Sequence, residues 1–291
     1  MSARESQGIR FRALALTAAQ LGPALTFFAI FFLVPATILI LYSFYRGGFF
    51  DLDKTFTVDN YVESFSDRTY RTVILNTLLL SLIVGVVVVL LAYPFSYYIC
   101  FLFPRKRELL LFLVLVSLFS GYLVRIYAWR TILGSEGIIN STLISIGARD
   151  EPLRFLLYSK FAVVVTLVNL TLPFAILPLY AAMQNVSSDA IEASRDLGAG
   201  RWISFRTIVL PLTIRGGLVA FAFAFVLTAG DYVTPTLVGG QGGVLVGNVI
   251  ADQFGAAGNL PLGAALGVVT IAVALICVLI VSSVAIKVAR R

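Results

Sequence analysis

Long apolar stretches separated by short polar segments repeat along the whole chain. A helix needs about 20 apolar residues to cross the hydrocarbon core of a bilayer, which is about 30 Å thick. By this criterion the pattern predicts six transmembrane helices, over residues 21–45, 73–100, 109–133, 161–183, 212–238 and 262–284. We therefore expect an all-α membrane protein with a single transmembrane domain over residues 1–291.

Two apolar segments need a separate interpretation. The segment 138–146 is too short to cross a bilayer, which favours an interfacial helix or a re-entrant dip. The first apolar run is longer than the core of a signal peptide, and no convincing cleavage site of small residues follows it. We expect this run to be an uncleaved first span.

The composition excludes a soluble domain and most kinds of active site. Of the 291 residues, 59% are hydrophobic and 13% are charged, and the mean hydropathy is +0.95. The sequence has no histidine, and its two cysteines, Cys100 and Cys277, each lie in an apolar run. It therefore lacks the commonest general base and offers neither a disulfide framework nor a cysteine metal site. We expect a protein that is not an enzyme and that holds no catalytic, metal or cofactor site.

The net charge of +7 is explained by membrane orientation. With the N-terminus in the cytoplasm, every predicted cytoplasmic segment is rich in Lys and Arg, as the positive-inside rule requires. The basic residues on that side are Arg4, Arg10, Arg12, Arg105, Lys106, Arg107, Arg195, Arg201, Arg206, Arg215, Lys287, Arg290 and Arg291. Both termini are thus expected in the cytoplasm, and nucleic-acid binding is not indicated.

One long polar segment, residues 185–211, separates two strongly apolar spans in the second half of the chain. Asp189 is expected to cap a short helix, with Glu192 three residues later completing a capping box. Gly198 then ends the helix, because glycine readily adopts the left-handed backbone conformation that is common just after a helix. The segment is therefore predicted to begin with a short helix followed by a turn.

A second helix is predicted after this turn. Trp202, Phe205 and Val209 lie at positions i, i+3 and i+7, an apolar stripe that can pack on the membrane domain. Small residues at Ala190 and Ala199 allow the surface of another protein to come close. The segment is expected to project into the cytoplasm and dock on a partner, whereas the simpler alternative is an ordinary interhelical loop.

The spacing of particular residues in this segment resembles the cytoplasmic loop of ABC importer permeases. The matching pattern is Glu192-Ala193-Ser194, then Gly198, then Ile208-x-Leu210-Pro211, with Ser194 in place of the second alanine usual in that family. The resemblance implies a type I permease fold in the bacterial inner membrane and a loop that couples to an ATPase. The candidate coupling residues are Asp189, Glu192, Ala193, Ser194, Gly198, Ala199, Ile208, Leu210 and Pro211.

The same resemblance implies several partners. They are a cytoplasmic ABC ATPase dimer, a second permease subunit and a periplasmic substrate-binding protein. The chain has no GxxxxGK[ST] motif for phosphate binding, so ATP is expected to be hydrolysed by the partner. Many polyamine systems pair two different permeases, which favours a paralogue over a second copy of this chain.

Residues 125–140 and 231–264 resemble the spermidine/putrescine branch of these permeases. Permeases for ferric iron, sulfate, thiamine and phosphonates share much of this layout and remain alternatives. A secondary transporter driven by an ion gradient is a further alternative. It is less favoured, because such carriers show intramembrane acids in paired repeats and this chain has one such acid and no convincing repeat.

A candidate substrate path follows from the residues near the outer half of the membrane. Asp231 is placed inside the predicted fifth span, where a charge costs about 2.5 to 3.5 kcal/mol, so it should face a cavity or a partner. Tyr127, Trp129 and Tyr232 offer aromatic faces for an ammonium group. Two alternatives stay open: an interfacial aromatic belt, and a structural ion pair between Asp231 and Arg125.

Overall fold

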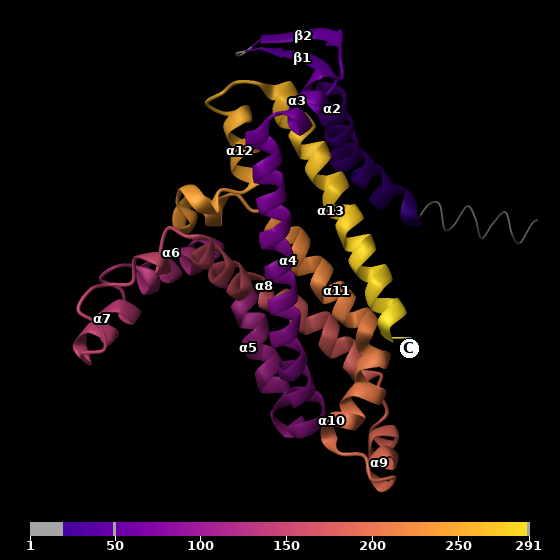
Figure 1. Cartoon of the computed structure of the whole chain (residues 1–291). Coiled ribbons are helices and arrows are strands. Elements are labelled where there is room, and N and C mark those ends of the chain that lie inside the picture. Colours follow the sequence, from indigo (N-terminus) through magenta and orange to yellow (C-terminus); the bar gives the residue numbers. More distant parts are fainter. Residues whose placement is uncertain (1–19, 49–50, 290–291) are drawn as a thin grey trace, which may run out of the picture.

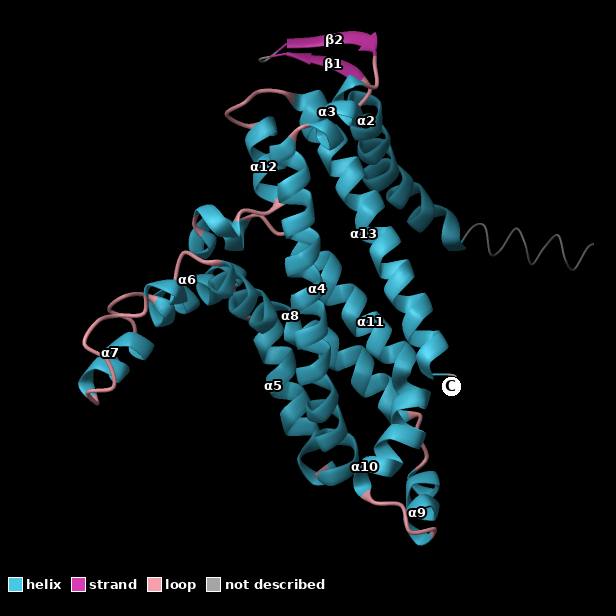
Figure 2. Cartoon of the chain, in the orientation of Figure 1, coloured by secondary structure: helices cyan, strands magenta, loops and turns pink. Residues whose placement is uncertain are grey.

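Helices make up almost the whole computed structural model, which describes residues 20–48 and 51–289 (Figures 1 and 2). Part of the predicted cytoplasmic charge lies outside these residues, namely Arg4, Arg10, Arg12, Arg290 and Arg291. The fold is that of an all-α membrane protein, apart from one short β-hairpin.

Five helices in the described part of the chain are long and apolar enough to cross a membrane. They are Gln20–Tyr42, Arg68–Leu102, Lys160–Met183, Arg201–Ala229 and Leu260–Lys287. Their main α-helical parts are α2 (Val34–Tyr42), α4 (Arg68–Tyr97), α8 (Lys160–Gln184), α11 (Leu210–Ala229) and α13 (Leu260–Ala289). They occupy the first, second, fourth, fifth and sixth predicted spans.

The third predicted span is not a single helix. The chain forms α5 (Arg107–Phe119) and then turns by 94° into a second helical segment, Tyr122–Ser145. Ser120 and Gly121 between them have extended ψ angles of 130° and 129°, which interrupts the helix. The 13 residues of α5 rise about 20 Å, less than the thickness of the hydrocarbon core. A bent pair of helices therefore stands in place of the single helix predicted over 109–133.

The segment after the bend contains α6 (Tyr122–Leu133) and α7 (Ile138–Ser145). These helices extend sideways from the bundle, so that α7 lies far from α11 and α13 (Figure 1). The helix α7 accounts for the short apolar segment predicted over 138–146.

The fifth span also differs from its prediction over 212–238. Its helix starts at Arg201 in the polar segment and ends at Ala229, where Gly230 forms the C-cap. A separate π-helical turn, Pro235–Gly239, follows. The predicted position of Asp231 inside this span is wrong, because Asp231 lies in the connection between the two helical segments.

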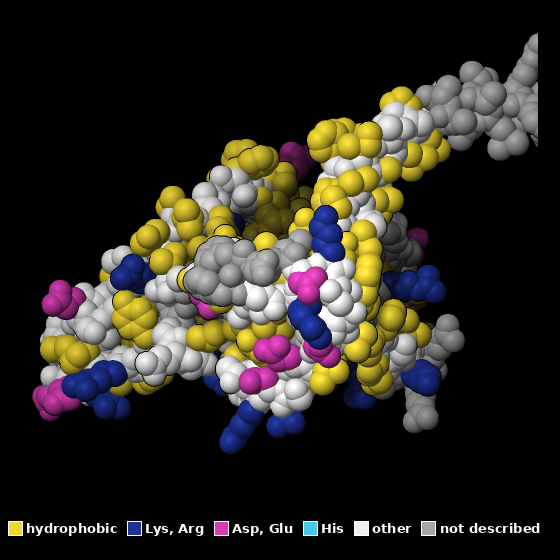
Figure 3. Space-filling model, turned by 90° about the horizontal axis from the view of Figure 1, so that it is seen from above, with side chains coloured by type: hydrophobic (Ala, Val, Ile, Leu, Met, Phe, Trp, Pro, Cys, Tyr) yellow, Lys and Arg dark blue, Asp and Glu magenta, His cyan; other side chains and the backbone are white. Residues whose placement is uncertain are grey.

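A small outer layer covers one end of the bundle. It consists of β1 (Tyr45–Gly48), β2 (Asp51–Phe56) and α3 (Asp59–Ser66), and α12 (Val246–Phe254) lies at the same end (Figure 1). Seen from this end, acidic and basic side chains gather on the end face, while hydrophobic side chains cover much of the rest (Figure 3). This distribution is typical of an end that lies outside the membrane.

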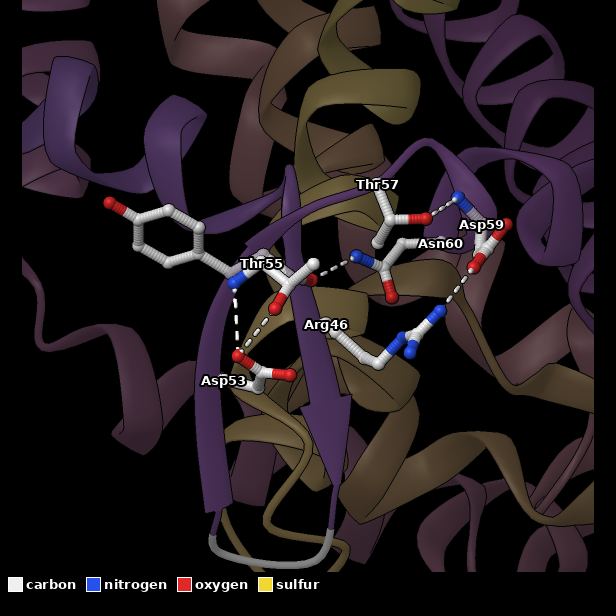
Figure 4. Close-up of polar contacts among 7 residues, drawn as sticks. Arg46, Asp53, Thr55, Thr57, Asp59 and Asn60 are labelled. Atoms are coloured by element: carbon white, nitrogen blue, oxygen red, sulfur yellow. Dashed lines mark hydrogen bonds and ion pairs between the residues drawn. The ribbon is translucent and has the colours of Figure 1, made fainter.

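Polar contacts hold the hairpin on α3 (Figure 4). The amide nitrogen of Asn60 donates hydrogen bonds to the carbonyl oxygens of Ser43 and Tyr45, at 2.9 and 2.8 Å. Arg46 forms an ion pair with Asp59 at 3.8 Å. An isolated two-stranded hairpin is marginally stable in water, so these contacts to a helix are needed to keep it in place.

The core of the bundle is formed by α4, α8 and α11, which pack against one another along their lengths. Close packing between α8 and α11 depends on Gly216, because a Cβ atom there would lie 2.4 Å from the Cβ atom of Ala182. Small residues are common at helix contacts in membranes, since they let backbones approach. This three-helix core connects the polar segment 185–211 with the region around Asp231.

Candidate coupling loop and membrane cavity

The polar segment 185–211 forms a projection at the end of the bundle opposite the hairpin (Figure 1). It contains α9 (Ser188–Asp196) and α10 (Arg201–Ser204). The helix α10 continues through a π-helical turn, Phe205–Val209, into α11. The predicted arrangement of helix, turn and helix is therefore present.

The cap at the start of α9 differs from the prediction. Ser187 is the N-cap, and its hydroxyl oxygen accepts a hydrogen bond from the backbone N–H of Asp189 at 3.2 Å. The prediction of Asp189 as the N-cap is wrong, because the helix starts at Ser188, two residues earlier than an N-cap at Asp189 requires. In the first turn, the carboxylate of Asp189 still interacts favourably with the positive end of the helix dipole. Glu192 is exposed on the surface of the same helix.

The end of α9 is closed by Gly198, as predicted. Gly198 has a φ of +87°, in the left-handed region. Its N–H donates to the carbonyl oxygen of Arg195 at 2.9 Å, and the N–H of Ala199 donates to that of Ser194 at 3.0 Å. These two bonds form a Schellman motif, which fixes the direction in which the chain leaves the helix.

The two helices of the projection are joined by a pair of serine side chains. The hydroxyl groups of Ser194 and Ser204 lie 2.7 Å apart, and Ser204 is buried. The alanine that is usual at this position in ABC importer permeases has no hydroxyl group and could not form this bond. Ser194 therefore contributes to the packing of α9 on α10.

The apolar stripe of the second helix is only partly covered. Val209 is fully buried, and the ring of Phe205 packs edge-on against the rings of Tyr93 and Tyr97 on α4. Trp202 stacks on Phe205 with a centroid distance of 5.6 Å but stays 70% exposed. Ile208, Leu210 and Pro211 are half-buried where the helix enters the bundle.

Large apolar side chains are left uncovered on the projection. Leu197 is 89% exposed, next to Gly198, and Ile203 is 54% exposed beside Trp202. Ala193 on α9 is exposed too, and its small side chain leaves room for a neighbour. Contiguous exposed apolar groups with a polar rim are typical of protein-binding surfaces.

A cavity of about 460 Å³ lies where α5 ends and α6 begins, bounded also by α8 and by the end of α11. Most of its lining is apolar. The polar side chains in the lining are those of Ser120, Tyr122, Arg125, Thr171, Asp231 and Tyr232.

Asp231 is held in this cavity by several hydrogen bonds. Its Oδ1 accepts from the hydroxyl of Tyr122 at 2.7 Å and from the backbone N–H groups of Val233 and Thr234 at 2.9 and 3.1 Å. Its Oδ2 accepts from the hydroxyl of Thr234 at 2.6 Å. The carboxylate thus caps the helical turn that starts at Val233, and its bond to Tyr122 connects this turn to α6.

The ion pair considered between Asp231 and Arg125 is not formed. Both side chains line the cavity, but within residues 20–48 and 51–289 Arg125 has no salt bridge. Its Nε and Nη1 atoms are buried and find no hydrogen-bond partner there. The side chain on α6 that contacts Asp231 is Tyr122, which donates a hydrogen bond to Oδ1.

The predicted substrate-path residues fall into two groups. Asp231 and Tyr232 line the cavity. The other two do not line it. Tyr127 is 51% exposed on α6, and Trp129 packs against the hydrophobic core. Tyr122 was missed. It lies three residues before Arg125 on the same helical face, but only the fold brings it to Asp231.

Known proteins with similar sequences are membrane permeases. The chain is 36% identical over 239 residues to the spermidine/putrescine transport system permease protein PotB of Haemophilus influenzae, covering 82% of this chain and 83% of that protein. It is 31% identical over 264 residues to the inner membrane ABC transporter permease protein YdcU of Escherichia coli, covering 86% and 83%.

Solved structures agree on the fold. A chain of a bacterial alginate ABC transporter, in complex with a periplasmic protein bound to an alginate pentasaccharide, superposes with a TM-score of 0.75. The superposition covers 93% of this chain and 94% of that chain, at 19% sequence identity. Residues 75–291 match the family described as binding-protein-dependent transport system inner membrane component. The chain belongs to this family and is a multi-pass protein of the inner membrane.

Proposed function

We propose that this chain is the permease subunit of an ABC importer that carries polyamines such as spermidine or putrescine. The similarity to PotB carries the proposal, because it extends over 82% of the chain. Ferric iron, thiamine, sulfate and phosphonate are the alternative substrates.

The chemistry of the cavity supports a cationic substrate. The two oxygens of a carboxylate offer about four acceptor positions, and Oδ2 of Asp231 accepts a single hydrogen bond within the described chain. An ammonium group can occupy the remaining position, and the half-exposed ring of Tyr232 beside it offers an aromatic face. In this proposal Asp231 and Tyr232 contact the substrate.

A separate cytoplasmic ATPase dimer supplies the energy in this proposal, and this chain binds no nucleotide itself. The docking surface is the projection, where Leu197 and Trp202 are uncovered and the Schellman motif at Gly198 holds them in a fixed orientation. A second permease subunit, expected to be a paralogue, completes the path. A periplasmic binding protein delivers the substrate.

One continuous helix links the projection to the cavity. The helix Arg201–Ala229 has 29 residues and is therefore about 43 Å long. It starts beside α9 and ends two residues before Asp231. Closure of the ATPase dimer would move the start of this helix, and a rigid helix passes that movement to the cavity and so switches the path between inward and outward access.

The proposal is tested by uptake of radiolabelled spermidine and putrescine into cells that express the whole system and lack their own polyamine importers. We expect ATP-dependent uptake that excess unlabelled polyamine suppresses. Suppression by thiamine, sulfate, phosphonate or ferric iron instead would assign the importer to that solute. Uptake that follows the proton gradient and ignores ATP would indicate a secondary transporter.

Asp231→Asn is expected to reduce polyamine uptake by at least about tenfold, since a neutral amide cannot replace a charge-assisted contact to an ammonium group. The asparagine oxygen still accepts from Tyr122 and from the two backbone N–H groups, so the local fold should persist. Initial uptake rates at equal membrane levels of the two proteins measure the effect. Full uptake with unchanged apparent affinity would show that Asp231 has only a structural role.

A further inference from the structure

A second hollow, apart from the cavity described above, lies at the end of the bundle that carries the projection. It is an open groove of about 950 Å³ between α4 and the helix that begins at Arg201. Its apolar lining includes Leu90 and Leu102 on α4, and Leu210 and Ile214 on α11. The side chain of Leu90 is 66% exposed and that of Leu102 is 41% exposed. The groove therefore leaves apolar surface free for an apolar occupant.

The groove matches one leaflet of the bilayer in position and length. Along α4 its lining extends from Val89 to Leu102, a rise of about 20 Å. One leaflet contributes about 15 Å, half of the hydrocarbon core. Leu102 is the last residue of the apolar span Arg68–Leu102, so the groove begins at the cytoplasmic membrane surface and reaches the middle of the bilayer. An acyl chain of the inner leaflet can lie along its whole length.

Positive charge lies at the cytoplasmic mouth of the groove. Arg201 is the one charged residue among the described residues that line it, and in the described part of the chain it forms no salt bridge. Arg105 and Lys106 follow Leu102 closely and are exposed. A guanidinium group binds a phosphate strongly, through two parallel hydrogen bonds. Basic pockets between transmembrane helices on the cytoplasmic side are typical sites for anionic lipid head groups.

Aromatic rings connect the mouth with the apolar part of the groove. Trp202 stacks on Phe205 with 5.6 Å between ring centroids, and Phe205 packs edge-on against Tyr97 at 5.7 Å. All three residues line the groove, as does Tyr98. Trp and Tyr are enriched at the membrane interface, where their rings contact lipid below the head groups. The order of basic, aromatic and aliphatic side chains thus follows the order of groups in a phospholipid.

We propose that this groove binds one anionic phospholipid of the inner leaflet, with its phosphate on Arg201 and an acyl chain along α4. The lipid contacts both α4 and the start of the helix that leaves the projection, so it steadies the projection against the bundle. The inference goes beyond the proposed function, because it concerns the membrane and is independent of the transported solute.

The test is photo-crosslinking of the assembled complex of permeases and ATPases in phosphatidylcholine nanodiscs. A small fraction of the lipid is a probe with a diazirine in its acyl chain and either a phosphatidylglycerol or a phosphatidylcholine head group. Mass spectrometry measures labelling of residues 91–102. We expect the phosphatidylglycerol probe to label this stretch at least about fivefold more, the preference that one basic contact near the membrane surface provides.

Two results of this experiment would overturn the proposal. Equal labelling by the two probes would mean that ordinary surrounding lipid fills the groove without selection for charge. No labelling by either probe would mean that a protein, such as a helix of the second permease subunit, covers the groove in the complex.

Substitutions of arginine test the contact with the head group. Arg201→Gln should remove the preference for the phosphatidylglycerol probe, whereas Arg201→Lys should keep it within about twofold, since it retains the charge. Arg206→Gln is the matched control, because Arg206 is exposed on the same helical segment and does not line the groove. It changes the net charge equally and should keep the full preference. An equal loss in Arg201→Gln and Arg206→Gln would show a general effect of surface charge and would contradict the proposal.

A substitution on α4 tests the acyl-chain part of the groove independently of the projection. Leu90→Trp adds volume to an exposed lining residue and should lower labelling of residues 91–102 by the phosphatidylglycerol probe at least about threefold, since the larger ring excludes part of the chain. Unchanged labelling would contradict the position of the lipid. This variant also carries the test if Arg201→Gln does not assemble with the ATPase.

Discussion

Gly198→Val is expected to reduce substrate uptake to background and to abolish co-purification of the ATPase subunits. Gly198 has a φ of +87°, and a left-handed conformation costs about 1 to 2 kcal/mol for an ordinary residue and more for a β-branched one. The Schellman bonds of Gly198 and Ala199 would open, and Leu197 would turn away from its present direction. Uptake assays and affinity purification of the complex measure both effects.

The expected loss of uptake in Gly198→Val comes from the backbone conformation at this position and not from the size of the valine side chain. A Cβ atom at Gly198 would have no neighbour within 4 Å beyond the adjacent residues, so the cost of a substitution comes from the positive φ. Gly198→Asn is the matched control, because asparagine tolerates the left-handed region. It should retain most of the uptake. Equal loss of uptake with asparagine and valine would contradict a conformational role for this position.

Gly216→Ala is the second substitution with a large expected effect. The added Cβ atom would lie 2.4 Å from the Cβ of Ala182 and 3.1 Å from the carbonyl oxygen of Pro178, neither of which can move without moving α8. Overpacking of this kind costs about 1 to 3 kcal/mol, occasionally more. We expect a lower melting temperature in detergent and a strong loss of transport, since α8 and α11 join the projection to the cavity.

Gly267→Ala in α13 is the control for this experiment. Both glycines lie inside helices, so both substitutions gain the same helix propensity. At Gly267, however, the added atom would meet only the side chain of Leu39, at 4.0 Å. This variant should be as stable as the wild type or more so. A melting temperature that falls equally in both variants would show that contact between α8 and α11 is not the cause.

Hydropathy predicted where the long apolar helices lie but not where each helix breaks or ends. The apolar character of residues 109–133 continues through Ser120 and Gly121, and side-chain polarity carries no information about a 94° change of direction. Similarly, the apolar residues on both sides of Asp231 suggested one span, whereas its hydrogen bonds to Val233 and Thr234 start a new turn.

Local sequence signals predicted the helix, turn and helix of the segment 185–211 well, with an error of two residues at the N-cap. Ser187 and Asp189 are both good N-cap residues, and the choice between them depends on where the preceding helix ends. Gly198 was predicted correctly because a left-handed helix end has a strong residue preference. The bond between Ser194 and Ser204 depends on how α9 packs on α10, which the sequence alone does not define.

The cavity depends on contacts that are distant in sequence. Tyr122 and Asp231 are 109 residues apart, and their side chains meet only because the chain breaks at Ser120 and again at Gly230. A single sequence contains no signal for such a pair. The hairpin at the other end was missed for a similar reason, since its strands are short, polar and stabilised by contacts to α3.

The most direct test of the account is the ATPase activity of the complete complex in lipid, with its binding protein, in the presence of putrescine, spermidine, ferric iron, thiamine or sulfate. The account predicts stimulation by a polyamine alone, because the substrate is polyamine and the loop 185–211 transmits its presence to the ATPase. Stimulation by another solute would contradict the polyamine assignment, and an assembled complex whose ATPase responds to no ligand would contradict the coupling role of the loop itself.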